Sequence, residues 1–131
     1  MLRKSEIIIA LGVVCFFVIC YAAASAIFQN TAYEIVVKSD LENFKKSQHN
    51  NWMLAGTFIG YQGEQLSADV ASSDFHFADW APSEGLVITV VSGNPGQPFD
   101  ENSPYVVEIT HNKLDKIIEY NFATHTLTEK Q

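Results

Sequence analysis

The pattern of hydrophobic positions begins with a segment that has no polar face at all. Of the 22 residues from 7 to 28, all except Gly12 and Ser25 are apolar or small, and none is charged. A helix of that length spans about 33 Å, which is enough to cross the hydrocarbon core of a bilayer. The sequence therefore predicts that residues 1–28 form the hydrophobic, transmembrane half of a helix.

The next segment, residues 29–50, is patterned as an amphipathic helix. It contains no Pro or Gly, so nothing in it interrupts the helix that precedes it. Its apolar residues recur at helical spacing and form one stripe, which we expect to pack against a sheet as the helix–sheet core. The stripe consists of Tyr33, Val37, Leu41 and Phe44. One helix shared by the membrane and the domain is thus predicted, ending at 49–51.

Residues 51–84 are interpreted as a connecting region, because glycines at 56, 60 and 63 break any regular pattern. From residue 85 the pattern changes to β-branched and apolar runs separated by turn residues, which predicts strands over residues 85–131. Short connections favour an antiparallel meander. The predicted fold class is α+β, with the long N-terminal helix packed on a four-stranded antiparallel sheet. The expected strands are 86–91, 105–110, 116–121 and 126–128.

Charge separates the same two parts of the chain. The whole chain has a net charge of −7, and residues 29–131 alone carry six Lys against fourteen Asp or Glu, a net of −8. Nucleic-acid-binding proteins display a basic patch, so we expect no nucleic acid among the partners. Cys15 and Cys20 both lie in the apolar segment and point apart on a helix, so no disulfide is expected within the chain.

The residues around the apolar segment predict its orientation in a membrane. Arg3 and Lys4 precede it and polar residues follow it, which places the N-terminus in the cytoplasm and the acidic domain outside the membrane. Two plain alternatives stay open. The segment is a secretory signal cut after Ala26, where small residues cluster, or it is a permanent single-pass anchor.

Glu6 offers a third interpretation, because it is a carboxylate at the mouth of an otherwise apolar helix. A charge that persists at a membrane boundary suggests a partner for it, although Glu6 can also sit in the headgroup layer beside Arg3 and Lys4.

Catalytic and cofactor chemistry has little support in the residues. The four histidines, at 49, 76, 111 and 125, have no metal-ligand spacing, and the chain has no Gly-rich phosphate loop or nucleophile elbow. The oxygen-rich residues 100–103 lack an EF-hand pattern. We expect no enzyme activity, no metal and no cofactor.

In order and register, these residues resemble a bacterial type IV pilin or a pseudopilin of type II secretion. Glu6 matches the near-terminal glutamate of that family, and 32–33 with 38–44 look like its stalk segment. The segments 80–91, 105–111 and 120–129 resemble its strands. The chain departs from the family at its start, where residues 2–5 read Leu-Arg-Lys-Ser without a preceding glycine, so that a leader is missing or processing does not occur. It also has Ala23 in place of a helix-kinking proline, and it lacks the C-terminal disulfide loop.

The resemblance implies a structural subunit of a pilus or secretion pseudopilus, a homo-oligomer that forms a helical filament through its N-terminal helix. Glu6, Arg3 and Lys4 would be the subunit-assembly residues. The other partners would be the membrane and the assembly machinery, and the location would be the inner membrane, with a periplasmic domain, or an extracellular filament. The alternative is a pilin-fold binding or scaffolding protein, anchored or secreted, that does not polymerise.

Overall fold

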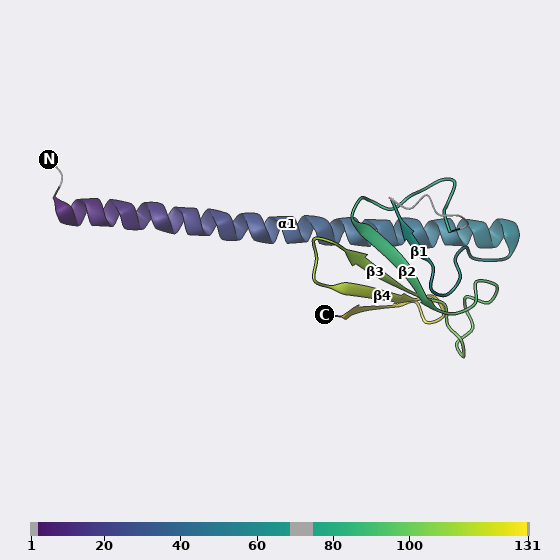
Figure 1. Cartoon of the computed structure of the whole chain (residues 1–131). Helices are drawn as coiled ribbons and strands as arrows, with labels where there is room; N and C mark the ends of the chain where they lie inside the picture. Colours follow the sequence, from purple (N-terminus) through teal and green to yellow (C-terminus); the bar gives the residue numbers. More distant parts are fainter. Residues whose placement is uncertain (1–2, 69–74, 131) are drawn as a thin grey trace. The chain divides into compact units, whose positions relative to one another are not determined.

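The computed structural model describes residues 3–68 and 75–130, and of residues 25–30 it describes the backbone alone. The chain divides into two compact units, Met1–Ala32 and Tyr33–Gln131, and the boundary falls inside the single long helix. Figure 1 labels the elements in chain order. They are α1 (Lys4–Ala55), β1 (Gln65–Ser67), β2 (Leu86–Ser92), β3 (Val106–His111), β4 (Ile117–Asn121) and β5 (Thr126–Lys130).

The first unit contains the apolar part of α1. Residues Lys4–Ala24 are long and apolar enough to cross a membrane, and none of this stretch is buried within the protein. Large side chains such as Ile8, Phe16 and Phe17 are exposed around the helix. So much exposed apolar surface needs a non-aqueous environment or a covering partner. This helix therefore qualifies as a membrane anchor or as a signal sequence, by its length and composition.

The second unit confirms the α+β class but corrects the number of strands. The sheet has five antiparallel strands in the order β1-β2-β3-β4-β5. The strand that sequence analysis missed is β1, which pairs with β2 through Leu66 and Ile88. It spans only three residues inside the glycine-rich region 51–84, so it has no alternating pattern long enough to be recognised.

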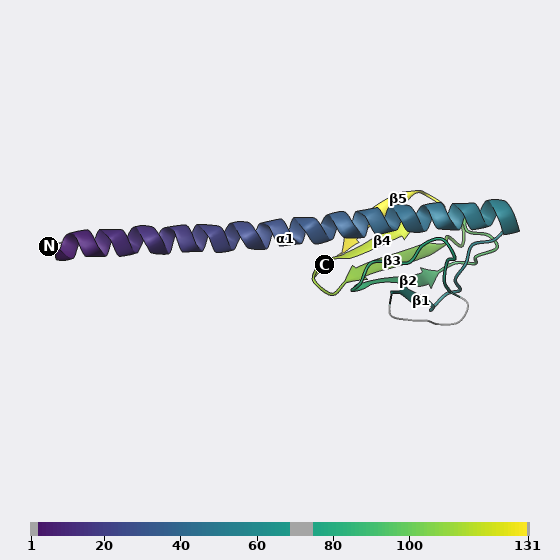
Figure 2. The same cartoon turned by 90° about the horizontal axis from the view of Figure 1, so that it is seen from above.

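One face of the sheet and the last part of α1 share a hydrophobic core. Alternate residues of β2, including Leu86, Ile88 and Val90, point to this face and are buried, as the period of a strand requires. Val107 and Ile109 of β3 do the same. Figures 1 and 2 show the last part of α1 lying along this face. Each fully buried side chain of this kind stabilises the fold by about 1.5–3 kcal/mol.

The helix ends at Ala55, five residues beyond the expected boundary at residue 50. Gly56 follows in the left-handed conformation, with φ of 71°, and its N–H donates to the carbonyl of Trp52. Because glycine adopts this conformation without a Cβ clash, Gly56 terminates the helix as its C-terminal cap.

Buried polar groups fix the loop that follows the helix. The Gln48 amide donates to the carbonyl of Ile59 at 2.7 Å and accepts the Ile59 N–H at 2.8 Å. The Tyr105 hydroxyl, from the residue before β3, donates to the carbonyl of Gly60 at 2.7 Å. Burial raises the pKa of Tyr105 well above its usual range, so the hydroxyl stays a neutral donor.

Candidate assembly site and its surroundings

The predicted assembly residues Arg3, Lys4 and Glu6 all lie in the first turn of α1. The backbone N–H of Arg3 donates to the Glu6 carboxylate at 3.1 Å, and the Ile7 N–H donates to the Arg3 carbonyl at the same distance. A Glu at the third helical position that accepts the N–H of the residue before the helix is half of a capping box. Glu6 therefore satisfies a backbone donor that the helix itself leaves unpaired.

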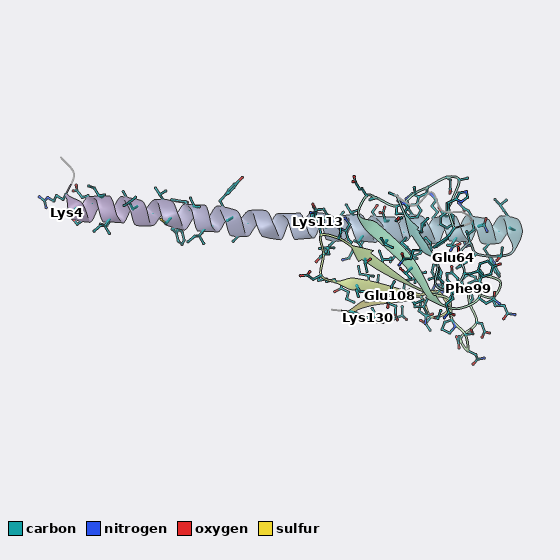
Figure 3. The ribbon with its side chains drawn as sticks, in the orientation of Figure 1. Lys4, Glu64, Phe99, Glu108, Lys113 and Lys130 are labelled. Carbon is teal, nitrogen blue, oxygen red and sulfur yellow. The ribbon has the colours of Figure 1, made fainter. Side chains whose placement is uncertain are left out.

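Electrostatics at this end of the helix favour the same arrangement. The negative charge of Glu6 lies near the positive end of the helix macrodipole, whereas Arg3 and Lys4 lie in the same turn with exposed side chains. Figure 3 labels Lys4 at the start of the helix. The turn thus presents one carboxylate and two cations at the edge of an apolar surface.

Two predicted features fall where the structure gives no description. Leu2, the expected first residue after pilin-type processing, lies outside the described residues, and the side chains around the possible cleavage site at Ala26 lie outside the described side chains.

The predicted helix–sheet stripe lies at unequal depths in the second unit. Val37, Leu41 and Phe44 belong to the core, and Phe44 has no exposed surface. Its ring makes edge contacts with Phe75, Phe77, Trp80 and Phe122 at centroid distances of 5.7–6.4 Å. Tyr33 is half-buried at the boundary of the unit and lies against the ring of His111, with centroids 4.8 Å apart.

Sequence analysis missed the polar residues on the buried face of α1. Asp40 is buried, and its carboxylate accepts the N–H of Ser83 at 2.8 Å, which fixes the chain just before β2. Gln48 is fully buried and holds Ile59. Both residues fall at helical spacing from the apolar stripe, and a polar residue at a core-facing position is the signal that could have revealed them.

An ion pair joins the start of the second unit to the sheet. Lys116, just before β4, lies 2.8 Å from Glu34 of α1 and 3.9 Å from Glu129 of β5. The hydrogen bond and the charge of Lys116 lower the pKa of Glu34, and the same contact raises the pKa of Lys116. Both side chains are about one-third exposed, so solvent weakens the pair.

The opposite face of the sheet carries a second group of charges. Glu108 and Glu119 are direct cross-strand partners on β3 and β4, an arrangement that is destabilising for like charges. Lys130 of β5 forms a salt bridge with Glu119 and lies 3.5 Å from Glu108, so one cation compensates both carboxylates. Figure 3 labels Glu108 and Lys130 in this group.

Within the described part of the chain, no three His, Cys, Asp or Glu side chains are arranged to hold a metal ion. Comparison with protein-family models, with curated proteins and with solved structures found no match to this chain. The molecule is defined by its own architecture, an α+β protein with an N-terminal apolar helix and a five-stranded antiparallel sheet.

Proposed function

We propose that the chain is a structural subunit of a filament like the type IV pilus or the type II secretion pseudopilus, assembling through the N-terminal half of α1. The observation that carries the proposal is the chemistry of residues 4–24. This helical stretch is exposed and apolar, and it begins with a turn that holds Glu6 among Arg3 and Lys4. A folded acidic domain follows it on the same helix.

Burial of apolar surface supplies the driving force for packing such helices together. Removing this surface from a wet surrounding is favourable by about 25 cal/mol per Å². In lipid that force is weaker, so assembly depends on close packing, on polar pairs and on machinery that lifts subunits from the membrane. The inner membrane would hold the unassembled subunit, and the acidic domain would cover the outside of the filament.

Glu6 would set the register between subunits. An unpaired carboxylate in an apolar bundle costs several kcal/mol, on the order of the desolvation of a charged group. A cation of a neighbouring subunit removes this cost, either the N-terminal amine or the side chain of Arg3 or Lys4. In this proposal Glu6 exchanges its contact with Arg3 N–H, or shares it, when the subunits assemble.

Two substitutions at Glu6 separate this intermolecular role from local capping. Glu6→Gln keeps an oxygen that accepts the Arg3 N–H and removes the charge, whereas Glu6→Ala removes both. We expect both variants to insert into the membrane and neither to form filaments, as judged by membrane fractionation and electron microscopy of sheared cell-surface material.

Glu101→Gln is the matched control, because Glu101 is an exposed acid in a loop of the second unit. It should assemble like the unmodified chain. Normal filaments from Glu6→Gln would remove the charge-pairing role and leave Glu6 as a helix cap.

One observation favours a second candidate, a pilin-fold binding or scaffolding protein that does not polymerise. Because Glu6 already accepts a hydrogen bond within its own turn, it does not need a neighbouring subunit to satisfy it. The N-terminal mass of the mature protein distinguishes the candidates. A methylated start at Leu2 indicates pilin-type processing, a start at Ile27 indicates a secreted domain, and an intact Met1 indicates a permanent anchor.

A further inference from the structure

A pocket of about 300 Å³ lies in the second unit, where α1, the β4–β5 hairpin and the loop around Phe99 meet. Its volume is at the lower end of the range for small-molecule sites, which suits a ligand of one or two rings. The lining divides into an aromatic floor and a charged rim. The floor consists of Phe58, Phe99, Tyr120 and Phe122, and the rim consists of Glu42, Lys45, Lys46, His49 and His125.

The floor is a set of rings that brace one another. Phe58 contacts Phe122 at 4.9 Å and Phe99 at 5.5 Å between centroids, in edge-to-face geometry, and Tyr120 contacts Phe122 at 4.9 Å. Phe58, Tyr120 and Phe122 are buried, whereas Phe99, labelled in Figure 3, is 41% exposed. A further aromatic ring in the pocket would find rings already held at stacking and edge-contact distance.

The rim has cations that the domain does not neutralise. Elsewhere in this acidic unit Lys116 and Lys130 are paired with carboxylates, and Lys45 lies 3.1 Å from Glu42 and 4.6 Å from the centre of the Tyr120 ring. Lys46 and His49 are exposed, lie one turn apart on α1 and have no carboxylate partner in the described part of the chain. An anion is the complement that they lack.

The backbone directs His125 toward the same rim. His125 lies in the turn between β4 and β5 with φ of 55°, a left-handed conformation that usually falls to Gly or Asn. Its Nδ1 lies 3.3 Å from the Tyr120 hydroxyl, and its ring centroid is 6.4 Å from that of Phe99. A non-glycine residue in a strained position that contacts the floor residues is typical of a binding site.

We propose that this pocket binds a small planar aromatic carboxylate, with its ring against Phe99 and Phe122 and its carboxylate near Lys46 and His49. Both parts of the ligand are needed, because the floor recognises a ring and the rim recognises a negative charge. The proposal does not rest on the filament function, since every residue it uses lies in the second unit.

Three probes of similar size test which chemistry the pocket selects. They are 1-naphthoate, its neutral analogue 1-naphthamide, and the aliphatic anion cyclohexanecarboxylate. Each is titrated into the full chain in non-ionic detergent, with binding followed by calorimetry and by NMR signals of the Phe99 and His125 rings. We expect saturable one-site binding of 1-naphthoate and at least tenfold weaker binding of the other two.

Substitutions in the rim and the floor locate the binding. Lys46→Gln combined with His49→Gln removes the rim charge at two exposed positions, and Phe99→Ala removes the exposed ring of the floor. Each variant should bind 1-naphthoate at least tenfold more weakly. Lys38→Gln is the matched control, an exposed lysine of α1 that does not line the pocket, and it should bind normally.

The rim variant is informative even if Phe99→Ala disturbs the fold, because its two positions are exposed; circular dichroism checks both. Undiminished binding by a folded rim variant, equal binding of the three probes, or no saturable binding of 1-naphthoate would each overturn the proposal. Loss of filaments in the Glu6 variants leaves it untouched, so the two proposals fail separately.

Discussion

Gln48 shows how much one polar side chain can organise in this molecule. It lies on a helix face that otherwise buries Val37, Leu41 and Phe44, and it is itself fully buried. Its amide group matches the N–H and the carbonyl of Ile59 at once. An amide is the side chain that offers both a donor and an acceptor in one plane, so a buried glutamine suits a buried peptide group.

We predict that Gln48→Leu destabilises the second unit. The leucine preserves size and helix propensity but leaves the Ile59 N–H without its partner, a loss of about 1–3 kcal/mol for an unsatisfied buried group. Denaturant unfolding of the full chain in detergent, followed by circular dichroism, measures the change. Gln62→Leu, at an exposed loop position, is the control and should leave the midpoint unchanged.

At the scale of elements, the contact between α1 and the sheet combines a hydrophobic face with one ion pair near its beginning. Glu34 and Lys116 are 82 positions apart in the chain, so their contact forms only when the helix lies on the sheet. The lowered pKa of Glu34 means that the folded state holds its proton less tightly than the unfolded state does. Stability from this pair is therefore present above the unfolded pKa of 4.5 and is lost as the pH falls through the lower, folded value.

We predict that Glu34→Gln flattens the acid side of the stability profile. The unmodified chain should lose this contribution only below pH 4.5, and the variant should lack it at neutral pH as well. Melting temperatures measured from pH 7 down to pH 3 test this. Parallel profiles for the two chains, offset or not, would show that Glu34 is not responsible, and Glu101→Gln serves as the unpaired reference.

The elements differ in how well the sequence predicts them. The helix and the strands β2 to β5 follow from apolar runs and glycine-rich turns, because each is long enough to show its period. β1 cannot be seen this way, since its place beside β2 depends on a pairing across more than twenty residues rather than on its own three. The end of α1 was misplaced because His49, Asn50 and Asn51 are poor helix formers that Trp52 and Asn51 hold in place through contacts with the next loop.

The candidate sites show a similar division. Glu6 could be singled out from sequence because a carboxylate beside an apolar run is unusual. The pocket around Phe99 could not, because its residues come from three segments that only the fold brings together. Lys46, His49 and His125 each read as ordinary surface residues until their positions around one aromatic floor are known.

At the scale of the whole molecule, the division at Ala32 and Tyr33 separates two chemistries. The first unit exposes apolar side chains along its helix, whereas the second has its own core and most of the acidic residues. A compact unit with its own core can fold without the segment that precedes it.

We predict that a chain starting at Tyr33 is soluble and folded without detergent. It should be monomeric by size-exclusion chromatography with light scattering, because the exposed apolar helix is gone, and its circular dichroism should show both helix and strand. The full chain in the same buffer should associate unless detergent is added. A truncated chain that is unfolded would show that the domain requires the first unit for stability.

β5 has a further consequence, which concerns the outer rim of the sheet. It is the last strand in the sheet order, its residues are all exposed, and Leu127 is 43% exposed. Such an open rim is a template for the addition of foreign strands, and charged side chains, lysine above all, are what proteins place there to discourage it. Glu129 and Lys130 occupy this rim, so the cation that compensates Glu108 and Glu119 also protects densely crowded copies of the domain from sticking together edge to edge.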